Sequence, residues 1–110
     1  MDKKKISLLW QRYLSGQEEG KDAYFDAEEI DDLLESFEEE DKFTHYDEVL
    51  ALGLRLHPGN PLLLIRQTKL LMYNEDYATA LTLLDSMNEI DNEDVDFLRM
   101  ECYVMRGDYD

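Results

Sequence analysis

The chain has 110 residues, 44% of them hydrophobic, and its 27 acidic against 11 basic side chains give a formal net charge of −16. This length suits one domain with a single core, and the apolar content is too high for an intrinsically disordered acidic chain. The negative charge argues against nucleic acid or an anionic membrane as a partner and favours basic partners. No apolar run approaches the roughly 20 residues of a membrane span. The lone Cys102 cannot form an internal disulfide, so we expect a cytoplasmic protein.

The N-terminal stretch predicts an amphipathic capping helix. In Lys4–Leu14 the apolar residues recur at spacings of three and four, which places them on one helical stripe. Ser15-Gly16 is expected to end this helix, and Gln17–Lys21 is expected to form an exposed loop. Because the stripe includes the only tryptophan, Trp10, we expect this helix to dock on the segment that follows and to cap it.

The next segment predicts a helix with a strong start. Asp26 and Glu29 have the spacing of a capping box, and Ala27–Glu39 then carries apolar residues at helical spacing. The other positions of this helix are mostly acidic, so its outer face is expected to be negative. The acidic residues that we assign to a binding surface are Glu28, Asp31, Asp32 and Glu35.

A polar break around Asp41 separates this helix from a second one. Thr44 is a suitable cap, and the apolar spacing continues to about Leu56 before Pro58-Gly59 ends the helix. The two helices are therefore expected to form one pair joined by a tight turn.

A second pair of helices follows. Asn60-Pro61 supplies a capping residue and a proline at the first helical position. Pro61–Tyr73 is apolar nearly all round, so we expect it to be buried on every side. Asp76–Met87 predicts its partner helix, and Asp94–Arg106 starts a third unit after a loop.

These segments form one structural unit written twice. A shift of 34 residues superposes the apolar positions of Ala27–Asn60 on those of Pro61–Asp94. The paired residues are Ile30 with Leu64, Phe37 with Leu71, Phe43 with Tyr77, Val49 with Leu83, and Leu50 with Leu84. A 34-residue period of helix–turn–helix units is the signature of a stacked helical repeat.

In this periodicity the chain resembles the tetratricopeptide repeat (TPR) family. The family's Gly-Asp-Tyr turn occurs as Gly107-Asp108-Tyr109, with an echo in Glu75-Asp76-Tyr77. The resemblance implies an all-α fold, a right-handed stack of antiparallel helix pairs with about six helices. It implies a capping segment at 1–26 and a TPR-like domain at 27–110, with repeats at about 27–60 and 61–92 and an incomplete one at 93–110. Tyr46 departs from the family pattern, because it replaces a small residue and should splay the first helix pair.

The resemblance also implies a function, since TPR proteins hold segments of other proteins in a groove lined by the first helix of each repeat. The matching positions here give an acidic wall of Glu28, Asp31, Asp32 and Glu35 and an apolar floor of Leu62, Ile65, Met72, Tyr73 and Phe97. The basic Lys69 lies at a further groove position. The expected ligand is a protein or peptide segment that carries Lys or Arg beside large apolar residues. An alternative is that the N-terminal helix, with Lys3–Lys5 and Trp10, fills this groove itself.

Two further hypotheses stay open. The chain stops where the second helix of a third repeat would begin, so Asp94–Arg106 is expected to expose apolar side chains. Further repeats of a longer chain, or a homodimer through this helix, would cover them. The other hypothesis is an acidic mimic of nucleic acid that occupies a basic protein surface.

No residue pattern indicates an enzyme, a cofactor or a metal site. His45 and His57 lack a second ligand at metal-binding spacing and are interpreted as solvated histidines. The acidic run Asp91–Asp96 lacks the glycine of a calcium loop and is interpreted as helix-capping acids. A glycine-rich phosphate loop and a serine nucleophile motif are also missing from the sequence.

Overall fold

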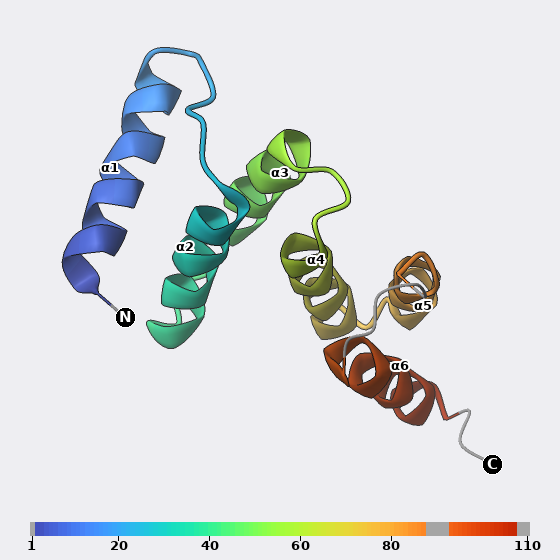
Figure 1. The fold of residues 1–110 in the computed structure, drawn as a ribbon. Helices are drawn as coiled ribbons and strands as arrows, with labels where there is room; N and C mark the ends of the chain where they lie inside the picture. Colours follow the sequence, from blue (N-terminus) through green and yellow to red (C-terminus); the bar gives the residue numbers. More distant parts are fainter. Residues whose placement is uncertain (1, 88–92, 108–110) are drawn as a thin grey trace. The chain divides into compact units, whose positions relative to one another are not determined.

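The computed structural model describes residues 2–87 and 93–107, and within these ranges it contains six α-helices and no strand (Figure 1). The helices are α1 (Lys3–Glu18), α2 (Ala27–Glu39), α3 (Tyr46–Leu56), α4 (Pro61–Tyr73), α5 (Tyr77–Asp85) and α6 (Glu93–Arg106). The prediction of an all-α fold with about six helices is confirmed. In the described part of the chain, no helix has the length and apolar character needed to cross a membrane.

The chain divides into two compact units, 1–63 and 64–110, and the division falls inside α4. In the first unit α1 packs against α2, and α2 packs against α3. In the second unit α5 packs against α6, and the core of that unit also takes Ile65 from α4. The buried apolar residues of this second core are Ile65, Ala80, Leu81, Leu84, Met87, Val95, Leu98 and Cys102.

The N-terminal helix is longer than the sequence predicts, because Gly16 does not end it. Gly16 is buried inside α1, and a Cβ atom there would lie 2.8 Å from the carbonyl oxygen of Lys21. Its role is therefore to let the returning chain pass close to the helix. The helix ends at Glu18 instead, and Gly20, which follows the C-cap Glu19, has φ +69°. The Lys21 N–H then donates to the Gly16 carbonyl at 3.0 Å.

The predicted starts of α2 and α4 are confirmed, whereas that of α3 is wrong. At α2 the capping box forms, and the Glu29 carboxylate accepts the backbone N–H of Asp26 at 3.0 Å. At α4 the Asn60 side chain accepts the N–H of Leu62 at 3.0 Å. Helix α3 begins only at Tyr46, whose N–H donates to the Phe43 carbonyl at 3.1 Å in a backbone turn.

The turns after α2 and α4 have the same backbone geometry. Asp41 (φ +55°) and Glu75 (φ +63°) both adopt the left-handed conformation, and they are 34 residues apart. In each turn the next N–H donates to a carbonyl five residues earlier: Lys42 to Phe37 at 2.8 Å, and Asp76 to Leu71 at 2.9 Å. The same turn thus recurs with the 34-residue period of the sequence, while the stacked TPR-like arrangement stays a prediction.

Helix α4 is not buried on every side, contrary to the expectation from its composition. Leu63 and Ile65 are buried, but Leu62 is 42% exposed and Tyr73 is 84% exposed. The apolar surface of this helix is therefore only partly covered.

Gly53 sets the distance between α2 and α3. A Cβ atom at this position would lie 2.7 Å from Cγ2 of Ile30 and 3.0 Å from Cδ1 of Leu63, and both side chains are fully buried. The bulky Tyr46 was expected to splay this pair, yet its side chain is accommodated in a buried position. The close contact at Gly53 is a feature that the sequence analysis did not single out.

Replacing Gly53 with alanine should destabilise the first unit. The new methyl group must displace Ile30, which should cost about 1–3 kcal/mol and outweigh the gain in helix propensity of about 1 kcal/mol. Urea unfolding followed by circular dichroism measures the change. In the background of Ile30→Ala, which removes the clashing Cγ2, Gly53→Ala should cost clearly less. Equal costs in both backgrounds would contradict this account of the contact.

Candidate functional site

An open groove of about 500 Å³ lies on the second unit. Its lining comes from α4, α5 and α6: Lys69, Met72, Tyr73, Tyr77, Asp94, Phe97, Leu98, Glu101 and Met105. Four of the residues predicted for the binding groove, Lys69, Met72, Tyr73 and Phe97, are brought together here.

Helical spacing explains why these side chains share one groove. On α4, residues Lys69, Met72 and Tyr73 follow the i, i+3, i+4 pattern of one face. On α6, Phe97 and Met105 are eight residues apart and line the groove, while Val95 and Cys102 are buried in the core. Leu98 lies between these two faces, since it is buried and also lines the groove. Each helix thus divides its apolar residues between the core and the groove.

The groove leaves large apolar side chains accessible to a partner. Tyr73, on α4, is almost wholly exposed, and on α6 Phe97 is 55% exposed and Met105 is also exposed. Charged groups stand beside them, with Lys69 on α4 and the carboxylates of Asp94 and Glu101 on α6. A segment that places apolar side chains here would bury surface that the chain itself leaves in water.

Two other predicted floor residues do not line this groove. Ile65 is only 8% exposed and belongs to the core of the second unit. Leu62 is exposed at the start of α4 but belongs to the first unit. The two residues differ because a helix that is apolar all round gives no sequence signal for which face is covered.

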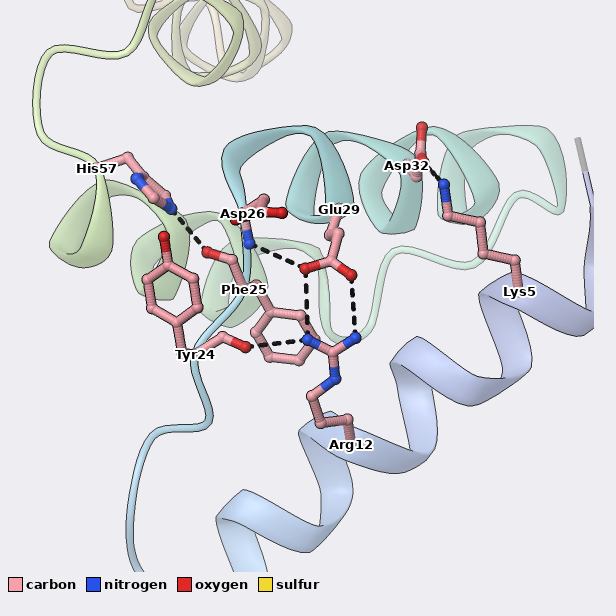
Figure 2. A network of polar contacts seen from close by, with 8 residues as sticks. All are labelled: Lys5, Arg12, Tyr24, Phe25, Asp26, Glu29, Asp32 and His57. Carbon is pink, nitrogen blue, oxygen red and sulfur yellow. Dashed lines mark hydrogen bonds and ion pairs between the residues drawn. The ribbon is translucent and has the colours of Figure 1, made fainter.

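The predicted acidic wall lies on α2 in the first unit, on its exposed and half-buried sides: Glu28, Asp31, Asp32 and Glu35. Asp32 forms an ion pair with Lys5 of α1, at 3.3 Å between Nζ and Oδ2. One acid of the wall is therefore already engaged by the N-terminal helix (Figure 2).

Arg12 links α1 to the connecting segment and to the start of α2 within the first unit (Figure 2). Its guanidinium donates to both carboxylate oxygens of Glu29, at 2.9 and 3.3 Å, and to the Tyr24 carbonyl at 3.1 Å. The same group lies 4.7 Å from the centroid of the Phe25 ring. The sequence does not indicate this network, because its members are separated by 12 to 17 residues and follow no motif.

The two histidines have structural contacts. The His57 ring donates from Nε2 to the Phe25 carbonyl at 2.7 Å, and its ring meets that of Tyr24 edge-on at 5.7 Å (Figure 2). His45 hydrogen-bonds through Nδ1 to the Glu48 carboxylate. Among the described residues there is no cluster of three or more His, Cys, Asp or Glu side chains suited to a metal ion.

Neither Cys102 nor the acidic run Asp91–Asp96 forms a second candidate site in the described residues. Cys102 is buried in the second core, and this burial raises the pKa of its thiol. A raised pKa disfavours the reactive thiolate, which fits a small apolar core residue. The run Asp91–Asp96 begins outside the described residues, and its described part opens α6.

A second hollow, of about 910 Å³, lies on the first unit between α1, the second half of α2 and the turn before α3. It is lined by Lys3, Ile6, Ser7, Trp10, Leu33, Ser36, Phe37, Glu39, Glu40, Asp41, Lys42, Phe43, Thr44 and His45. The helical pattern of the sequence does not predict this hollow. Its one sequence signal is the grouping of aromatic residues beside acidic ones at the end of α2.

No family model matches the chain, and neither the curated proteins nor the solved structures gave a match. The resemblance to TPR proteins therefore depends on the residues and the period described above.

The Arg12–Glu29 pair should make stability depend on pH. Hydrogen bonding from Arg12 is the largest cause that holds the pKa of Glu29 below its ordinary value of 4.5. A carboxyl with a lowered pKa in the folded state stabilises fully above its unfolded pKa, and that contribution disappears as the pH falls through the folded value. Glu29→Gln should therefore cost about 1 kcal/mol at pH 7, given the partial exposure of the pair, and progressively less below pH 4.5.

Urea unfolding of the original protein and of the Glu29→Gln variant, between pH 7 and pH 3, measures the difference in their free energies of unfolding. The matched control is the same substitution in an Arg12→Gln background, where the pH dependence of the difference should shrink. If Glu29→Gln changes the free energy of unfolding by the same amount at every pH while Arg12 is present, the Arg12–Glu29 pair is not the source of the pH dependence.

Proposed function

We propose that this chain is a non-enzymatic protein-binding module, a TPR-like scaffold that holds a peptide or protein segment in the α4–α6 groove. The supporting observation is that Lys69, Met72, Tyr73 and Phe97, assigned to a binding surface from the sequence, line one open groove. The recurrence of the same left-handed turn 34 residues apart supports the relation to helical repeats. We place the protein in the cytoplasm, in keeping with its single cysteine.

The chemistry of the groove favours a partner with large apolar side chains beside Lys or Arg. The apolar side chains would enter between Tyr73, Phe97 and Met105 and supply most of the affinity. Basic side chains would meet Asp94 and Glu101 and the general negative field of a chain with net charge −16. These charges would act mainly on the association rate and on partner choice.

A random-peptide display library, selected against the whole chain, tests this function. Peptides that combine Lys or Arg with large apolar residues should be enriched. Phe97→Ala should weaken the selected peptides about tenfold or more, because truncating a central aromatic contact costs more than 1 kcal/mol. The matched control is Met100→Ala, on the same helix and 57% exposed but outside the groove lining, which should have little effect.

Two results would count against the groove. Equal loss of affinity from Phe97→Ala and Met100→Ala would show that the selected peptides do not use it. Binding that disappears on raising the salt from 50 to 500 mM, and that ignores Phe97→Ala, would instead favour the acidic nucleic-acid mimic. Peptide binding that persists at 500 mM salt and still depends on Phe97 supports the groove as the binding site.

A second candidate function arises from the other exposed apolar residues of α6. Met100, Tyr103 and Val104 are exposed and do not line the groove. Such a surface suits packing against another helix, from further repeats or from a second copy of the chain.

The homodimer is the testable form of this second candidate. Sedimentation velocity at rising concentration should show reversible association that Val104→Glu abolishes, because a charge would be buried in the contact. Leu8→Glu, at an exposed position of α1, is the control and should leave the association unchanged. A monomer at every concentration would rule out the homodimer.

A further inference from the structure

Three aromatic rings from three segments line the hollow of the first unit: Trp10 on α1, Phe37 on α2 and Phe43 in the turn before α3. The Trp10 ring stacks on Tyr13 with 5.1 Å between centroids, and it meets Phe37 edge-to-face at 5.8 Å. The centroid of the His45 ring lies 5.0 Å from that of the Trp10 ring. These neighbours hold the indole in place without a ligand, so this wall of the hollow is pre-organised.

Phe43 is the most exposed aromatic ring of the three that line the hollow. It is 51% exposed, whereas its counterpart 34 residues later, Tyr77, packs against the core of the second unit. The Phe43 ring contacts the buried ring of Tyr46 with 5.8 Å between centroids, and about half of its surface stays accessible. Its exposed ring lines the hollow, where it is available to a ligand.

The rim of the hollow is acidic. Glu39, Glu40 and Asp41 stand at the C-terminal end of α2, whose last turn contains no basic residue. The helix dipole is negative at this end, so it adds to the potential of the three carboxylates instead of offsetting it. Lys42 pairs with Glu40 at 3.5 Å and Lys3 also lines the hollow, which leaves more acidic than basic groups around it.

Aromatic walls with an excess of carboxylates select a cation over an anion or a neutral side chain. Among protein cations, the planar guanidinium of arginine both stacks on an aromatic ring and donates two parallel hydrogen bonds to a carboxylate. The volume of about 910 Å³ is large enough for such a side chain with part of its backbone.

We propose that the hollow between α1, α2 and the turn 40–45 binds an arginine side chain of a basic protein segment, with the guanidinium against Phe43 and Trp10 and its N–H groups directed to Glu39 and Asp41. This site belongs to the first unit and is independent of the α4–α6 groove.

The only tryptophan of the chain lines the hollow and reports directly on its occupancy. The whole chain is titrated with the acetylated and amidated peptide Gly-Arg-Gly-Arg-Gly, up to millimolar concentration, while Trp10 fluorescence is followed. We expect a saturable change in fluorescence. The lysine analogue should bind about threefold or more weakly, and the glutamine analogue should give no saturable signal.

Variants at the hollow locate the site. Phe43→Ala should weaken the arginine peptide about fivefold or more, and Glu39→Gln, at an exposed position, should weaken it in the same direction. Leu8→Ala is the matched control, an equally accessible apolar residue of the same unit outside the lining, and should leave the affinity unchanged. Far-ultraviolet circular dichroism confirms that each variant retains its helices.

The remaining outcomes each overturn the proposal. Absence of a saturable signal, or equal affinity for the arginine and glutamine peptides, removes cation selection. If neither Phe43→Ala nor Glu39→Gln weakens binding, the peptide is held by the general acidic surface. If Phe97→Ala weakens the arginine peptide and Phe43→Ala does not, the α4–α6 groove binds it. In that case the proposed function survives and the second site does not.

Discussion

The left-handed residue at the end of α2 and of α4 is the constraint on which both helix pairs depend. Asp41 and Glu75 adopt positive φ without being glycine, which costs on the order of 1 kcal/mol each. In return the chain reverses within a few residues, and the last carbonyls of the helix find backbone donors. The following helix then begins close to the one just completed, and α2 can pack against α3 through Ile30 and Gly53.

The N-terminal helix is held to the first unit by polar contacts as well as by apolar burial. Arg12 joins Glu29, the Tyr24 carbonyl and the Phe25 ring, so one side chain links α1, the connecting segment and the start of α2 (Figure 2). Glu29 also completes the capping box of α2, and the same carboxylate therefore serves both the local helix start and the tertiary contact. This fixed position of α1 creates one wall of the hollow that contains Trp10.

Both candidate binding surfaces arise where aromatic residues exceed what the adjacent core can cover. In the second unit these are Tyr73 and Phe97, and in the first unit Phe43. Exposed rings lower the free energy gained on folding but raise the gain on binding, because their burial is deferred until a partner arrives. The negative charge of the chain then biases that partner towards basic segments.

The sequence by itself determined the helices and the 34-residue period, because caps, helical spacing and turn residues act over about five positions. It therefore predicted α4 without error, and it placed Met72, Tyr73 and Phe97 on one surface through the resemblance to TPR proteins. Only the tertiary structure decided that Gly16 and Gly53 are sites of close approach, that Ile65 belongs to the core, and that Arg12 binds Glu29. Each of these depends on which residues distant in the sequence come into contact, and an apolar or charged residue has the same local pattern whether a neighbour covers it or not.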